Sequence, residues 1–123
     1  MKATELRIGN WLIDKRYTHD SENGRFKVHV RDLQYLTDIK ESNECDFEPI
    51  PLTEEILLKC GFKYYKEDNS YQLDFGFYCI WGRLEKEFTL YSNGDETETE
   101  IKYLHQLQNL YWCLTGQELE VNL

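Results

Sequence analysis

The chain has 123 residues, which is the size of one ordinary domain. Hydrophobic residues make up 41% of it and aromatic residues 15%, a composition that excludes an intrinsically disordered protein. The formal net charge of −9 opposes binding to polyanions and disfavours nucleic acid as a partner. No apolar run is long enough to span a bilayer and the first residues lead into no signal-peptide core, so we expect a cytoplasmic protein that makes no membrane contact.

The charge is unevenly distributed along the chain. Residues 1–40 hold eight Lys and Arg against six Asp and Glu, whereas residues 41–123 hold six against 17. Six bases of the first third are candidates for a patch that binds phosphate or an acidic partner: Arg7, Lys15, Arg16, Arg25, Lys27 and Arg31. The alternative is that they are ordinary solvated charges, which we favour because nucleic-acid-binding domains are usually basic as a whole.

Residues 1–40 predict a small, curled, barrel-like sheet. Two β-prone runs, 11–13 and 26–30, flank the turn dipeptide Asn23-Gly24, and a third strand is expected at 33–39. The acidic stretch 41–48 that follows reads as a surface loop.

Residues 52–62 predict a short central helix. Thr53 is a suitable N-cap, Glu54 and Glu55 face the positive end of the helix dipole, and Gly61 ends the helix. Beyond it, β-prone runs separated by turn residues predict an antiparallel meander with strands at 62–65, 71–75, 77–81, 88–91 and 97–101.

The longest predicted helix covers residues 101–115 and ends at Gly116. Its leucines and tyrosines form one stripe, which we expect to pack on the meander. The fold class is therefore α+β, as a single domain over 1–123: a curled sheet in 1–40, then the short helix, meander and C-terminal helix as one continuous core in 41–123.

A second strip on the C-terminal helix mixes apolar and amide side chains with few charges: Ile101, His105, Gln108, Asn109 and Trp112. Such a mixture is typical of the middle of a protein interface, so these five are the candidate partner-binding residues. The alternative is that the N-terminal sheet covers the strip inside the same chain, with His105 and Asn109 bonded to backbone groups. We favour this alternative, because exposed apolar patches are uncommon in monomers.

No pattern indicates a reaction, a metal or a cofactor. The four cysteines, Cys45, Cys60, Cys79 and Cys113, form no CxxC pair, and in the expected compartment they should be reduced. His19 beside Asp20 is a candidate general base, but neighbouring loop residues rarely face one another. A hydrolase using His19 or His105 is therefore disfavoured, and no catalytic residue is predicted.

Three stretches of the chain form a distinctive set: Glu5-Leu6-Arg7-Ile8-Gly9-Asn10-Trp11; Ile50 to Glu55 with Leu57 to Phe62; and Ile101 to Tyr111 with Leu114-Thr115-Gly116. This set resembles a family of small uncharacterised proteins from prophages and mobile elements of anaerobic gut bacteria. The resemblance implies an origin in mobile or phage-derived DNA and brings no activity, cofactor or catalytic residue.

Two functional hypotheses follow from these observations. The first is a non-catalytic protein-interaction or accessory module of a phage-derived or mobile element, which binds a protein partner or itself. The alternative is a nucleic-acid-associated protein or an acidic DNA mimic, whose negative row would be Asp95, Glu96, Glu98 and Glu100.

Overall fold

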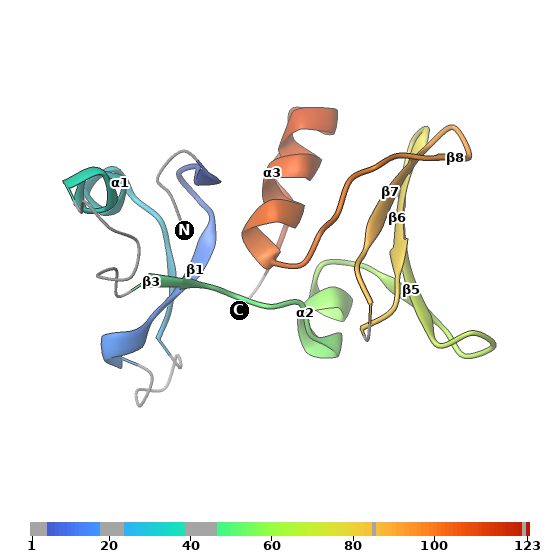
Figure 1. The fold of residues 1–123 in the computed structure, drawn as a ribbon, viewed down its shortest axis with the longest axis horizontal. Coiled ribbons are helices and arrows are strands. Elements are labelled where there is room, and N and C mark those ends of the chain that lie inside the picture. The colour runs from blue at the N-terminus through green and yellow to red at the C-terminus, as the bar shows by residue number, and fades with distance from the viewer. Residues whose placement is uncertain (1–4, 18–23, 39–46, 85, 122) are drawn as a thin grey trace. The chain divides into compact units, whose positions relative to one another are not determined.

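The computed structural model describes residues 5–17, 24–38, 47–84, 86–121 and 123 (Figure 1). The chain divides into two compact units. Unit 1 consists of Met1–Pro51 with Tyr103–Glu118, and unit 2 of Leu52–Lys102 with Leu119–Leu123. These boundaries differ from a division at residue 40, and the assignment of a single domain stays a prediction.

Unit 1 contains a three-stranded antiparallel sheet and two α-helices. Its elements are β1 (Trp11–Asp14), the 3₁₀ turn η2 (Lys15–Tyr17), β2 (Arg25–Lys27), α1 (Val30–Asp38), β3 (Phe47–Pro49) and α3 (Leu104–Thr115). The sheet order is β2-β1-β3, and the described strands form no closed barrel. Leu12, Val28 and Phe47 form the buried core of this sheet, and Leu33 and Tyr35 of α1 pack against them.

The strand expected at 33–39 is wrong, because residues 30–38 form α1. The Asp32 carboxylate accepts a hydrogen bond from the His29 backbone N–H (2.8 Å), and the Asp32 N–H donates to the His29 carbonyl (3.0 Å). This reciprocal capping closes the first helical turn and outweighs the β-propensity of Tyr35 and Thr37. The third strand of the sheet is β3 instead.

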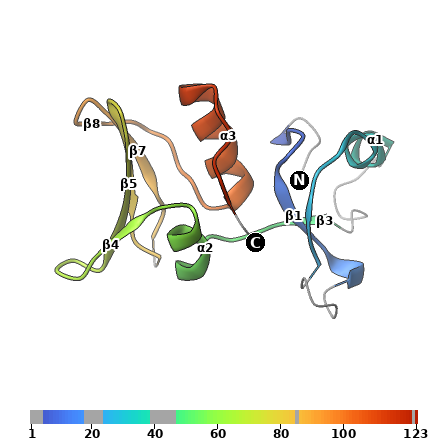
Figure 2. The same ribbon diagram turned by 180° about the vertical axis from the view of Figure 1, so that it is seen from behind.

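Unit 2 contains a short helix and a five-stranded antiparallel meander (Figures 1 and 2). Its elements are α2 (Glu54–Lys59), β4 (Lys63–Tyr65), β5 (Ser70–Phe75), β6 (Tyr78–Gly82), β7 (Thr89–Ser92) and β8 (Asp95–Glu96). The register places Leu73, Ile80 and Leu90 side by side on one face, with Ile80 fully buried. Together, the two antiparallel sheets and three α-helices confirm the α+β class.

The strand predicted at 97–101 is wrong, because the last described strand of the meander is Asp95–Glu96. Asn93 (φ 52°) and Gly94 (φ 87°) form a two-residue turn, so that Asp95 pairs with Ser92 at once and the strand spans only Asp95–Glu96. After it, the Thr97 N–H and hydroxyl both donate to the Leu90 carbonyl. Ile101 then forms an isolated bridge with Phe88.

The ends of α2 confirm their sequence signals. The Thr53 Oγ1 accepts a hydrogen bond from the Ile56 N–H (3.3 Å), which satisfies a backbone donor of the first turn. Gly61 takes φ 95° just beyond the helix, and the Phe62 N–H donates to the Leu57 carbonyl (3.0 Å). This is the Schellman arrangement, which glycine permits at little steric cost.

We expect Thr53→Ala to lower the free energy of unfolding by about 1 kcal/mol, because the Ile56 N–H loses its partner. Thr53→Ser keeps the hydroxyl and should stay close to the wild type. Chemical denaturation of the three proteins measures the difference, and equal losses in both variants would contradict a capping role.

Candidate functional site

Helix α3 carries most of the candidate partner-binding residues, and it begins three residues later than expected. The helix starts at Leu104, after a capping box in which the Tyr103 N–H donates to Gln106 Oε1 (3.2 Å). It ends as expected at Gly116, whose φ is 71°.

The structure does not present the five candidate residues as one open strip. Ile101 belongs to unit 2, where it exchanges backbone hydrogen bonds with Phe88 (2.9 and 3.2 Å). Exposure is 1% for Ile101, 4% for His105 and 2% for Gln108, whereas Trp112 is 41% exposed. The three buried side chains therefore form no open surface, in line with the favoured alternative, and partner binding by the strip stays a prediction that rests on Trp112.

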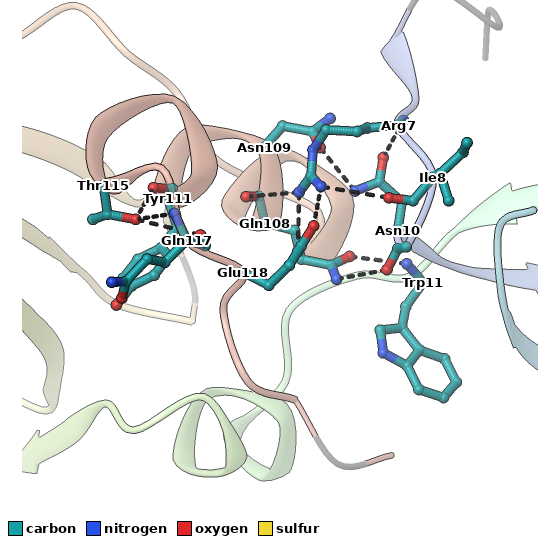
Figure 3. A network of polar contacts seen from close by, with 11 residues as sticks. Arg7, Ile8, Asn10, Trp11, Gln108, Asn109, Tyr111, Thr115, Gln117 and Glu118 are labelled. Atoms are coloured by element: carbon teal, nitrogen blue, oxygen red, sulfur yellow. Dashed lines mark hydrogen bonds and ion pairs between the residues drawn. The ribbon is translucent and has the colours of Figure 1, made fainter.

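Gln108 bonds to the backbone of the N-terminal segment 5–11 (Figure 3). Its Nε2 donates to the Gly9 carbonyl (3.1 Å), and its Oε1 accepts from the Trp11 N–H (2.9 Å). One side-chain amide thus supplies both a donor and an acceptor to the chain that leads into β1, as a neighbouring strand would.

Asn109 extends this contact to three more residues. Its Oδ1 accepts from Asn10 Nδ2 (2.8 Å) and Arg7 Nε (3.2 Å), and its Nδ2 donates to the Glu5 carbonyl (3.0 Å). We call the hydrogen bonds of Gln108 and Asn109 to residues 5–11 the amide joint. Within unit 1, residues 5–11 therefore cover Gln108 and Asn109. Most of this segment precedes the first strand of the sheet.

Arg7 links the amide joint to the end of α3. Its guanidinium pairs with the Glu118 carboxylate and donates to the Gln108 carbonyl (3.3 Å) (Figure 3). The guanidinium carbon also lies 4.9 Å from the Trp112 ring centroid. Trp112, the exposed member of the strip, therefore already has a cation over its ring.

We expect Gln108→Met to lower the free energy of unfolding by about 2 kcal/mol, because the half-buried Gly9 carbonyl and Trp11 N–H lose their partner. Gln117→Met, the same change at an exposed position, is the matched control and should cost little. Equal denaturation midpoints for the two variants would contradict the structural role of Gln108.

His105 is the buried titratable group of α3. Its ring stacks on Tyr103, with centroids 6.0 Å apart, and its Nδ1 has no hydrogen-bond partner among the described residues. Burial lowers the pKa of His105 below its ordinary value, and the charge of Glu5 opposes that shift only in part. The folded state therefore holds this imidazole neutral.

Because the folded-state pKa of His105 is lowered, unfolding takes up a proton here, and stability should fall as pH drops below about 6.5. We expect His105→Asn to lose less stability than the wild type between about pH 7.5 and about pH 5. The exposed His29, changed to Asn, is the control. Denaturation curves at both pH values test this, and parallel pH dependences of wild type and His105→Asn would contradict it.

Four of the six N-terminal bases line one pocket of unit 1, with a volume of about 440 Å³. They are Arg16, Arg25, Lys27 and Arg31, from η2, β2 and the first turn of α1. The other two lie elsewhere. Arg7 belongs to the amide joint, and the Lys15 Nζ lies 3.6 Å from Glu48 Oε1. We call this cavity the basic pocket.

Both carboxylates in the basic pocket are already engaged. Arg16 donates to Asp14 from its backbone N–H (3.0 Å), Nε (3.0 Å) and Nη2 (2.8 Å), and these bonds lower the pKa of Asp14. Asp32 caps α1. The guanidinium groups of Arg25 and Arg31, by contrast, form no hydrogen bond or ion pair with the described residues, and the Lys27 Nζ lies 5.5 Å from the Trp11 ring centroid. The pocket thus has two cations free to meet a ligand.

The thiols of Cys60 and Cys79 are not activated for chemistry. Burial raises the pKa of Cys60 to about 12, and burial with a hydrogen bond to Asp74 raises that of Cys79 to about 12. Both therefore stay protonated, which a nucleophile or metal ligand does not. Cys60, Cys79 and Cys113 are free, whereas Cys45 and His19 lie outside the described residues.

Other candidate features are absent from the part of the chain that the structure describes. It contains no group of three or more His, Cys, Asp or Glu side chains placed to hold a metal ion. None of its helices has the length and apolar character needed to cross a membrane. The acidic row Asp95, Glu96, Glu98 and Glu100 is exposed, with only its first two residues in a strand.

Comparison with protein-family models, with curated proteins and with solved structures finds no match.

Proposed function

We propose that the protein is a non-catalytic binding module that accepts an anionic group of its partner in the basic pocket of unit 1. The observation that carries the proposal is charge. In a chain with a net charge of −9, four Lys and Arg side chains line one cavity with two carboxylates, both engaged. Such a local excess of positive charge attracts an anion even where the whole molecule does not.

The elements around the pocket suit an anionic group. Arg25 and Arg31 offer planar guanidinium groups, which bind carboxylate or phosphate with two parallel hydrogen bonds. The first turn of the nine-residue helix α1 adds partial positive charge on the same side, although Asp32 offsets part of it. The volume of about 440 Å³ lies within the usual range for ligand pockets.

The same residues favour binding over catalysis. Asp14 is held ionised by Arg16, and its lowered pKa makes it a weak base. Phe26 and Phe47 supply shape and apolar surface, with ring centroids 4.8 Å apart. The accessory role in a mobile element that the sequence resemblance implies stays a prediction.

The test is a titration with inorganic pyrophosphate, followed by the amide NMR signals of residues 24–32. We expect those signals to move in the wild type, and the Arg25→Gln/Arg31→Gln double variant to bind about tenfold more weakly or worse, because it loses two charge-assisted contacts. Added salt should weaken binding to the wild type.

The matched control is Lys63→Gln/Lys66→Gln, which removes two exposed charges of unit 2 and should bind like the wild type. Circular dichroism confirms that each variant is folded. Equal weakening in both double variants would point to diffuse attraction, and no movement of signals 24–32 in the wild type would refute the pocket.

A further inference from the structure

We infer that the partner's anionic group belongs to an acidic, extended peptide segment that pairs with β2 as an additional strand. This inference rests on the proposed function, since it places the ligand in the basic pocket, and it specifies the partner and how it binds. Three features of unit 1 carry it: the free edge of β2, the course of the pocket along that edge, and the charges beside it.

Strand β2 lies at the edge of its sheet. In the order β2-β1-β3, β1 is its strand neighbour on one side, and the described residues place no strand on the other. An edge strand presents a row of unpaired backbone groups, which is a template for another strand.

The register identifies which backbone groups face outward. The Asp14 N–H donates to the Gly24 carbonyl (2.7 Å), and the Val28 N–H donates to the Asn10 carbonyl (2.8 Å), so residues 24 and 28 direct their polar groups at the β1 side. Because the direction alternates along an antiparallel strand, Phe26 faces β1 as well, whereas Arg25 and Lys27 face away. The N–H and C=O groups of Arg25 and Lys27 therefore have no strand partner in the part of the chain that the structure describes.

The basic pocket follows this edge. Gly24, Arg25, Phe26 and Lys27 are consecutive, and all four line it, as expected of a cavity that runs along the strand. Phe26 stands on the opposite sheet face from its two neighbours, beside Phe47. An added strand would therefore meet cations on one face and an aromatic surface on the other.

The charges select the occupant. Arg25 and Lys27 share one face of β2, where acidic side chains at alternate positions of an added strand would stand opposite them. The same two cations would repel the β2 edge of a second copy, which disfavours pairing between identical edges. A nucleic-acid backbone is long enough to reach beyond the pocket. There it would meet the surface of a chain whose net charge is −9, which repels it.

The experiment compares two forms of one capped peptide of alternating Glu and Thr: the plain peptide, and a form N-methylated at every second residue. Both carry the same charge, but N-methylation removes the N–H groups that strand pairing uses. We expect the plain peptide to bind the wild type about tenfold more tightly, the equivalent of one or two hydrogen bonds.

Amide hydrogen exchange provides the second readout. The plain peptide should slow exchange at Arg25 and Lys27 and leave Phe26, which already faces β1, nearly unchanged. A fold-wide stabilisation would slow all three alike, so this pattern is specific to pairing at the outer edge.

The outcomes separate this inference from the proposed function. If both peptides and pyrophosphate bind but N-methylation makes no difference, the anion site stands and strand pairing is refuted. If none of the three binds, the proposed function fails too. A single-stranded oligonucleotide that displaces the plain peptide from β2 would overturn the inference in favour of nucleic acid.

Discussion

The amide joint between α3 and residues 5–11 is the contact on which unit 1 depends. Gln108 and the Gly9 carbonyl that it bonds are 99 residues apart in sequence, and the Gln108 side chain is 2% exposed. Backbone groups cut off from water need partners, and here two side-chain amides supply them in place of another strand. The joint thereby fixes the start of β1, and through the β1–β2 register it also fixes the strand that lines the basic pocket.

The two ends of unit 1 divide its charged residues between structural and binding roles. At the amide joint, the Arg7 guanidinium already pairs with Glu118, donates to Asn109 and lies over the Trp112 ring. At the pocket, the Arg16 side chain pairs with Asp14, whereas the guanidinium groups of Arg25 and Arg31 have no partner among the described residues. The six bases look equivalent in sequence but differ in their capacity to bind an anion. A side chain that already pairs with a carboxylate of the same chain attracts a ligand less than one without such a partner.

Local signals predict most of unit 2, apart from its last strand. Thr53 and Gly61 mark the ends of α2, and Asn93-Gly94 marks a hairpin, because capping and turn chemistry acts over a few residues. The strand predicted at 33–39 is wrong because the deciding interaction is a helix cap, the hydrogen bond from the His29 N–H to the Asp32 carboxylate. The helical pattern predicts which side chains share the strip on α3. It does not predict that residues 5–11 cover Gln108 and Asn109, because no local pattern encodes the position of that segment. The basic pocket was visible only as an uneven charge distribution.

The chain order of the two units has a consequence for biosynthesis. Residues Leu52–Lys102, nearly all of unit 2, interrupt unit 1, and the Leu52 N–H donates to the Lys102 carbonyl (3.3 Å) where that insertion begins and ends. A ribosome releases β1, β2 and β3 long before α3 is made. During translation the meander can form from contiguous sequence. Until Gln108 is made, the Gly9 carbonyl and the Trp11 N–H are hydrogen-bonded to water instead. The sheet of unit 1 is thus made before the meander but gains its contact with α3 only after the meander, and a nascent chain cut short before residue 108 lacks the Gln108 side chain that forms this contact.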